Sequence, residues 1–205
     1  WIPLAEVRAG AAALAARLGR LAGMIVVADA ETDADLEALV DAALAVEPPP
    51  LLAGSAGLAR PLAARLGCLA GPASIPAGRW LIVAGSLHPA TRRQIAEARR
   101  AGLRVLTTPE HEDGDRARAA AALAAEAARL LAQESFDLVV VTGGETAVAL
   151  YRARGAHRID LVGAPGPGLA LGRLQAPGRA ALTVMTKAGG FGPPRLFVSL
   201  LEAAA

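Results

Sequence analysis

Residues 138–146 read Leu138-Val139-Val140-Val141-Thr142-Gly143-Gly144-Glu145-Thr146, an unbroken apolar run that ends in a glycine pair. Consecutive apolar residues of this kind are typical of a strand that is buried on both faces of a sheet. The two glycines allow a tight turn with positive φ, and the residues from about Glu145 to Arg152 predict a helix. This stretch therefore predicts a strand, a turn and a helix, the repeating unit of an α/β fold.

The same arrangement is predicted around two other short turns. Gly85-Ser86 lies between a predicted strand, Trp80 to Ala84, and a predicted helix, Pro89 to Ala101. Gly54-Ser55 precedes a helix that should end near Leu66. Further strands are predicted at 103–107, 159–162, 169–174 and 181–186, and further helices from about 116 to 132 and from 194 to 204. This alternation indicates a three-layer α/β domain, with a mainly parallel or mixed sheet and helices on both faces.

The first part of the chain is predicted to be more helical. Leucine and valine recur at helical spacing from Leu4 to Arg20, and Met24 to Ala30 is a short β-branched run that predicts a strand. Thr32 or Asp33 is expected to cap a helix that continues to about residue 44. Residues 51–54 predict a weak strand. The stretch 67–79, rich in glycine and proline, indicates a connector between two packed units.

Composition excludes several classes of protein. The formal net charge is only +2 and aromatic residues make up 3% of the chain, so the scattered arginines do not indicate a nucleic-acid-binding surface. No apolar run approaches the roughly 20 residues of a membrane span. Cys68 is the single cysteine, which excludes a disulfide framework and favours a reduced, cytoplasmic setting. Since the chain starts at Trp1, we expect it to begin within a longer protein.

Turns between a strand and a helix place free N–H groups at the carboxyl edge of a sheet, where α/β proteins bind anions. Ser86, Thr142 and Thr146 add hydroxyls beside these turns. Glu145 either reaches Mg²⁺ through water or only stabilises the first turn of its helix. No paired Cys/His motif occurs, so we predict no direct ligation of a metal by the protein. The usual nucleotide-binding glycine signatures are also missing.

Lys187 is the only lysine among the 21 basic residues, and it lies in the stretch Lys187-Ala188-Gly189-Gly190-Phe191-Gly192. One lysine in an arginine-rich chain indicates a position that needs a compact ammonium. The neighbouring glycines let backbone N–H groups approach a phosphate. The alternative is a solvated lysine in an ordinary turn. The predicted phosphate-binding set is Ser86, Thr142, Gly143, Gly144, Glu145, Thr146, Lys187, Gly189 and Gly190.

Several stretches, taken in order, resemble the C-terminal nucleotide-binding domain of the four-carbon acid sugar kinases, also labelled a Hrp-dependent type III effector family. They are Ala28-Asp29-Ala30 with Asp35-Leu36, Gly54 to Ala59, Gly85-Ser86 through Thr91 and Gln94, Thr142 to Ala147, and Thr186 to Gly192. The resemblance runs from about Met24 to the end of the chain. Two positions depart from the family pattern: Ala188 stands where serine is expected, and His88 stands where many members have serine.

The resemblance implies one nucleotide-binding domain over residues 1–205 that uses ATP or ADP with Mg²⁺, in a kinase for threonate, erythronate or 3-oxo-tetronate. It implies that Ser86, the turn from Gly143 to Thr146 and the Gly189-Gly190 loop contact the nucleotide. Lys187 would offset charge on the transferred group. The acid sugar would bind to an N-terminal domain that we expect to be missing from this chain, so no sugar pocket and no obvious general base is expected here. A homodimer is one option for the assembly. Two alternatives stay open: a nucleotide-binding or effector-type interaction protein without catalysis, and a pterin- or phosphosugar-binding domain.

Overall fold

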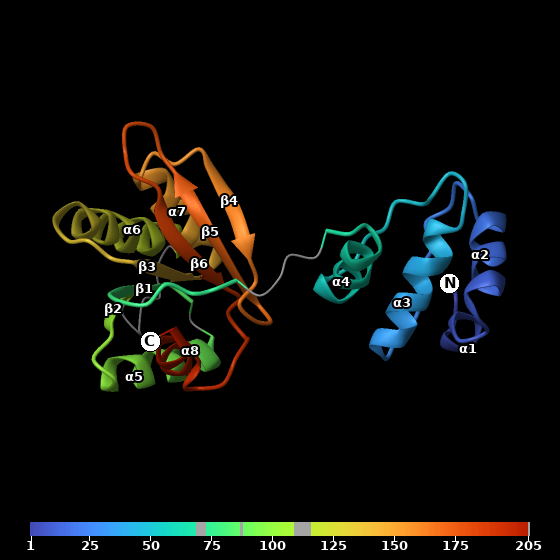
Figure 1. The fold of residues 1–205 in the computed structure, drawn as a ribbon, viewed down its shortest axis with the longest axis horizontal. Helices are drawn as coiled ribbons and strands as arrows, with labels where there is room; N and C mark the ends of the chain where they lie inside the picture. The colour runs from blue at the N-terminus through green and yellow to red at the C-terminus, as the bar shows by residue number, and fades with distance from the viewer. Residues whose placement is uncertain (69–72, 87, 109–115, 205) are drawn as a thin grey trace. The chain divides into compact units, whose positions relative to one another are not determined.

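The computed structural model describes residues 1–68, 73–86, 88–108 and 116–204. The chain forms two compact units, Trp1–Leu69 and Ala70–Ala205 (Figure 1). The boundary between the two units falls inside the stretch 67–79, for which the sequence indicates a connector. Residues 69–72 of that stretch lie outside the described part of the chain.

The second unit is built on a mixed sheet of six strands in its described part. The strands are β1 (Trp80–Ala84), β2 (Arg104–Thr107), β3 (Leu138–Thr142), β4 (Arg158–Gly163), β5 (Leu169–Gln175) and β6 (Leu182–Lys187). Their order across the sheet is β2-β1-β3-β6-β5-β4. The first four of these strands run parallel, and β5 pairs antiparallel with both β6 and β4. The predicted α/β sheet is therefore confirmed.

Four helices cover the two faces of this sheet: α5 (Pro89–Arg100), α6 (Arg116–Gln133), α7 (Gly144–Ala153) and α8 (Leu196–Ala204). Alternate residues of a strand point to opposite faces of the sheet, so each fully buried strand contributes side chains to two hydrophobic cores, one on each face. Ile82 packs in one core with Ile95 of α5 and Phe197 of α8. Leu81 packs in the other with Leu123 of α6 and Leu150 of α7. Figure 1 shows the two pairs of helices on opposite sides of the sheet.

The first unit is helical, with α1 (Leu4–Val7), α2 (Ala11–Arg20), α3 (Asp33–Leu44) and α4 (Ala56–Arg65). The single helix predicted over Leu4–Arg20 is wrong, because Gly10 takes φ +105° and separates α1 from α2. Thr32 is the N-cap of α3, as the sequence indicates. Pro61 lies inside α4, which continues to Arg65. The small core of this unit contains Ile2, Val7, Leu14 and Ala42.

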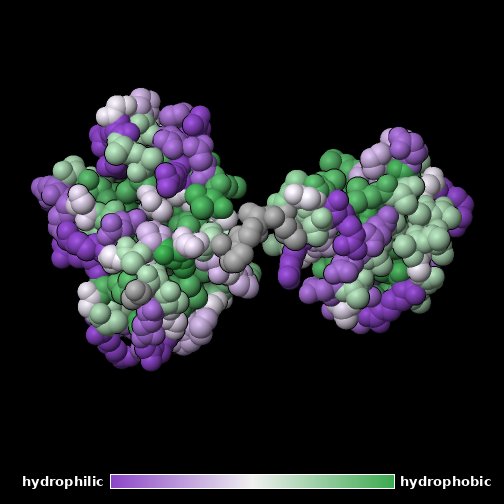
Figure 2. Space-filling view, viewed as in Figure 1, coloured by the Kyte–Doolittle hydropathy of each residue, from purple (hydrophilic) through white to green (hydrophobic). Residues whose placement is uncertain are grey.

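The strand predicted over Met24–Ala30 does not form. Its backbone makes one isolated parallel bridge, between Ala28 and Ile2, where Ile2 N donates to Val27 O at 2.8 Å. Ile25 is 99% exposed, and hydrophobic residues are visible at the surface of this unit in Figure 2. A strand needs a neighbouring strand for its backbone hydrogen bonds, and among the described residues only Ile2 forms a bridge with this segment. The weak strand predicted at 51–54 is also absent from the assigned elements.

Candidate functional site

The carboxyl ends of β1, β3 and β6 lie next to one another in the sheet. Ala84 is in register with Thr142, and Thr142 is in register with Lys187. The chain leaves each strand at the same edge, so the three turns that follow emerge side by side. The structure thus brings together the three glycine-containing segments that the sequence singles out in this unit. Gly54-Ser55 belongs to the other unit.

The turns after β1 and β3 are in direct contact. Gly85 N donates to Thr142 O at 3.0 Å. Gly85 leaves room for the hydroxyl of Thr146, which a Cβ at that position would overlap. Gly143 takes φ +103°, and a Cβ there would lie 3.2 Å from Ser86 N. Glycine is needed at both positions for two backbone segments to approach this closely.

The loop after β6 closes on the same place. A Cβ on Gly189 would lie 3.0 Å from Ser86 Oγ, and one on Gly190 would lie 3.3 Å from His88 Nε2. Among the described residues no atom would lie within 4 Å of a Cβ on Gly144, so that side of the turn is open. Ser86, the Gly143-Gly144 turn and the Gly189-Gly190 loop therefore surround one part of the sheet edge.

The two helices that start at this edge differ in their capping. His88 Nδ1 accepts a hydrogen bond from Ala90 N at 3.2 Å, so the first turn of α5 is capped by a side chain. The N-cap of α7 is Gly143, which has no side chain to accept such a bond. The first N–H groups of α7 are therefore open to an anion, and the helix dipole favours negative charge there.

Lys187 is 3% exposed, in contrast to the solvated lysine of the alternative interpretation. Its Nζ donates to Ala188 O at 2.8 Å, to Gly189 O at 2.9 Å and to Thr91 Oγ1 at 3.4 Å. Burial lowers the pKa of this ammonium. The side chain thus turns back onto its own loop and onto α5.

Two buried polar residues of α5 join this site in a role that the sequence does not reveal. Thr91 Oγ1 donates to Gly189 O at 2.8 Å, and Gln94 Nε2 donates to Phe191 O at 2.9 Å and Gly192 O at 3.0 Å. Both residues belong to one of the stretches that carry the family resemblance in the sequence, and their spacing of three residues places them on one helix face. Gln94 Oε1 and Thr142 Oγ1 are buried without a hydrogen-bond partner among the described residues.

A shallow depression of about 360 Å³ lies at the other end of the sheet, where residues that begin β1 and β2 line it. Two of its charged lining residues are paired with each other: Arg79 Nη2 donates to Glu134 Oε2 at 2.6 Å, and the Arg79 guanidinium lies 5.1 Å from the centre of the Phe136 ring. The glycine turns are not part of this depression, and the free N–H groups favour them as the functional site.

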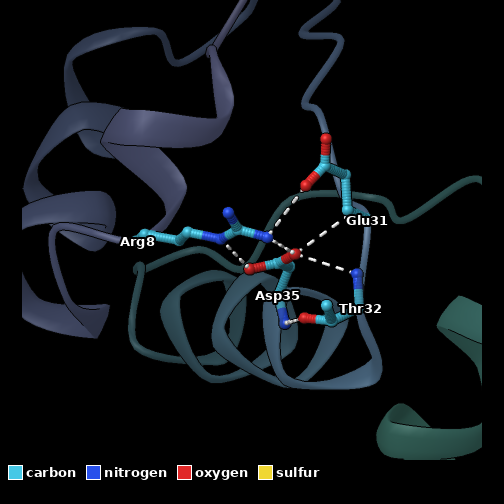
Figure 3. Close-up of polar contacts among 4 residues, drawn as sticks. All are labelled: Arg8, Glu31, Thr32 and Asp35. Atoms are coloured by element: carbon cyan, nitrogen blue, oxygen red, sulfur yellow. Dashed lines mark hydrogen bonds and ion pairs between the residues drawn. The ribbon is translucent and has the colours of Figure 1, made fainter.

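The first unit contains a separate polar cluster around Asp35, which is 4% exposed (Figure 3). Its carboxylate accepts hydrogen bonds from Arg8 Nε at 2.8 Å, Arg8 Nη2 at 2.9 Å, Glu31 N at 3.0 Å and Thr32 N at 2.9 Å. The Arg8 guanidinium, followed by the backbone N–H groups, holds the pKa of Asp35 well below its usual range. Asp35 N donates to Thr32 Oγ1 in return, so Thr32 and Asp35 form a capping box at the start of α3. The bonds from Arg8, at the end of α1, connect α1 to α3.

Among the described residues no group of three or more His, Cys, Asp or Glu side chains is placed to hold a metal ion. In the same part of the chain, no helix combines the length and apolar character of a membrane span.

Comparison with known proteins indicates the family to which this chain belongs. Residues 105–197 match a model described as a nucleotide-binding C-terminal domain, and residues 1–62 match one described as a sugar-binding N-terminal domain. D-threonate kinase of Cupriavidus necator is 34% identical over 93% of this chain and 57% of its own length. The D-threonate kinase of Bordetella bronchiseptica is 32% identical over 94% of this chain and 55% of its own length. The chain belongs to the four-carbon acid sugar kinase family.

Solved structures agree with this placement. A crystal structure from Bordetella bronchiseptica, a domain-swapped dimer with bound citrate, is 32% identical and covers 95% of this chain and 55% of its own, with a TM-score of 0.55. A protein from Salmonella typhimurium LT2 is 22% identical with a TM-score of 0.72, covers 96% of this chain and 57% of its own, and supports the fold alone. This acid sugar kinase family member spans little more than half the length of the relatives it matches.

The match of residues 1–62 to a sugar-binding model differs from the expectation that such a domain is missing from the chain. In this family member the segment corresponds to the helical first unit, Trp1–Leu69.

Proposed function

We propose that the chain is the nucleotide-binding region, with an adjoining part of the sugar-binding region, of an ATP-dependent kinase for four-carbon acid sugars. Threonate is the first acceptor to test, because two relatives are D-threonate kinases; erythronate and 3-oxo-tetronate follow. The observation that carries the proposal is the meeting of three glycine turns, after β1, β3 and β6, at one sheet edge.

The residues at this edge are suited to bind the phosphates of a nucleoside diphosphate or triphosphate. Gly143 leaves the first N–H groups of α7 uncapped, and the open side of Gly144 gives a phosphate room to approach them. Ser86 Oγ lies between this turn and the Gly189-Gly190 loop, where its hydroxyl can donate to a phosphate oxygen. Bound ATP supplies the phosphoryl group that a sugar hydroxyl accepts, and positioning with charge stabilisation provides most of the catalysis in such transfers.

Mg²⁺ belongs to the same proposal. Glu145 is exposed in the first turn of α7, beside the proposed phosphate position. Mg²⁺ keeps several waters and binds through one or two carboxylates together with substrate phosphates, so one carboxylate that acts through water suffices. The absence of a clustered metal site among the described residues is compatible with this arrangement.

The test is calorimetric titration of residues 1–205 with ADP and ATP, each with and without Mg²⁺, followed by an assay of phosphoryl transfer to D-threonate. Micromolar, Mg²⁺-sensitive binding supports the nucleotide site, and transfer to threonate supports the kinase. Binding without transfer favours the alternative of a non-catalytic nucleotide-binding or effector-type protein. A folded chain that binds neither nucleotide, but retains a pterin or a phosphosugar, contradicts the proposal.

We also propose a homodimer and a cytoplasmic location. The Bordetella bronchiseptica relative is described as a domain-swapped dimer. Cys68, exposed and unpaired in the described residues, is compatible with a reducing compartment. Light scattering coupled to size-exclusion chromatography tests the dimer, and a monomeric mass at micromolar concentration contradicts it.

A further inference from the structure

The hydrogen bonds of Lys187 use all three hydrogens of its ammonium. Ala188 O, Gly189 O and Thr91 Oγ1 accept them at 2.8, 2.9 and 3.4 Å. An ammonium has three donors and no acceptor, so in this arrangement none is left for a phosphate oxygen. A buried charge is costly unless hydrogen bonds match it, and these three acceptors provide that match.

The two carbonyls that face Lys187 determine where the neighbouring N–H groups point. In a trans peptide the C=O and the N–H of one plane point in opposite directions. The carbonyl of Ala188 shares a plane with the N–H of Gly189, and the carbonyl of Gly189 shares one with the N–H of Gly190. Because both carbonyls turn inward to the ammonium, both N–H groups turn outward. Successive outward N–H groups form an anion-binding concavity.

Helix α5 holds the same loop from the other side. Thr91 Oγ1 donates to Gly189 O at 2.8 Å, and Gln94 Nε2 donates to the carbonyls of Phe191, Gly192 and Pro193 at 2.9 to 3.1 Å. Both side chains are fully buried. The carbonyls of the loop are therefore occupied by buried donors from residues almost a hundred positions earlier in the chain.

We propose that Lys187 is a positioning residue: with Thr91 and Gln94 it orients the peptides of Gly189 and Gly190 toward the phosphates and does not itself contact them. This inference rests on the proposed nucleotide site, and it replaces the direct charge-stabilising role that the sequence suggests for Lys187. It also leads us to expect that arginine cannot replace Lys187, because a planar guanidinium fork differs in shape and donor geometry from a compact ammonium.

The experiment uses the full 205-residue chain and the variants Lys187→Met, Lys187→Arg and Thr91→Val. Thr183→Val, at the amino-terminal end of β6, is the matched control. The first measurement is hydrogen exchange of the Ala188 and Phe191 amides without nucleotide, since these amides donate to Gly168 O and Ala188 O. We expect about tenfold faster exchange in all three site variants and no change in the control, because each site variant loses one or more bonds that hold the loop.

The second measurement is ADP affinity, in which we expect a loss of about tenfold for Lys187→Met and a loss also for Thr91→Val. Weaker ADP binding by Lys187→Met, with loop exchange and Thr91→Val unchanged, would show direct contact and overturn the inference. Full affinity in Lys187→Arg would also overturn it. If the wild-type chain does not bind ADP, the proposed nucleotide site is contradicted. The role of Lys187 in positioning the loop is then tested by the exchange measurement alone. An unchanged exchange rate in Lys187→Met would refute that role.

Discussion

The hydroxyl of Thr146, on the first turn of α7, occupies the space that a side chain on Gly85 would need. This pair holds the turn after β1 against the helix after β3, and the Gly85 N bond to Thr142 O reinforces the contact. The proposed phosphate site depends on this close approach, because Ser86 follows Gly85 directly.

Gly85→Ala should destabilise the second unit by about 2 kcal/mol, since the new Cβ forces one of the two segments to move. Chemical denaturation followed by the fluorescence of Trp80 measures the change. Gly144→Ala is the matched control: a Cβ there meets no atom within 4 Å, so its stability should stay within about 0.5 kcal/mol of wild type. Adding Thr146→Ala to Gly85→Ala should recover part of the loss; equal stability of the two glycine variants would contradict the packing described.

Ser86→Ala should weaken ADP binding about three- to tenfold, roughly the net value of one ordinary hydrogen bond, with little change in melting temperature. Ser199→Ala, on an exposed position of α8, is the control and should bind as wild type does. Calorimetry measures both. Unchanged affinity in Ser86→Ala would show that this hydroxyl does not contact the phosphate, but it would not contradict phosphate binding by the backbone N–H groups of the turns.

Asp35 should make the first unit sensitive to acid. Its pKa in the folded state is depressed, so its stabilising contribution is complete above the ordinary carboxyl pKa of about 3.9 and is lost as the pH falls below that value. Asp35→Asn should therefore reduce the protection of α3 amides at neutral pH and flatten the acid dependence. Hydrogen exchange of α3 from neutral pH down to about pH 2 tests this, because the loss is expected below the ordinary carboxyl pKa. Asp33→Asn, an exposed neighbour in the same turn, should retain the wild-type profile.

Tyr151 is the only tyrosine of the chain, so its ionisation can be followed alone. Burial raises the pKa of its hydroxyl to about 12. The neutral form is favoured in the folded state, so this contribution to stability is present below pH 10 and is lost as the pH rises toward 12. A tyrosinate absorbance titration of the native chain should show no ionisation near pH 10, and unfolding in denaturant should restore the ordinary value.

Tyr151→Phe should be neutral or stabilising by up to about 1 kcal/mol, since the buried Oη has no partner among the described residues. A loss larger than this would indicate that the hydroxyl has a partner in solution. Thermal denaturation of the two proteins, at a pH where the wild-type hydroxyl stays neutral, compares them directly.

Local sequence patterns predict most of the second unit, because its central strands β1 and β3 are apolar, fully buried and followed by a glycine turn. The run that ends at Thr142 and the glycine pair after it place a strand, a turn and a helix within a residue or two of their observed bounds. The same pattern indicates that the turns after β1 and β3 share one edge. The nucleotide contacts assigned to them stay a prediction.

Two features depend on distant residues and could not be predicted. The burial of Lys187 results from Thr91, 96 positions away, and no local pattern contains that contact. The segment Met24 to Ala30 has the composition of a strand, but a strand also needs a neighbour, and Ile2 is the only residue bridged to it in the described chain.

The segment Met24-Ile25-Val26-Val27 has a consequence for the handling of the protein. It is uncharged, rich in β-branched residues and free of proline, and Ile25 is 99% exposed, whereas Val26 packs partly against the small core. An extended segment of this composition is a template onto which an equivalent segment of another molecule can add, so self-association should rise steeply with concentration. A charged residue at Ile25, which packs against nothing in its own unit, should keep concentrated samples dispersed without loss of fold.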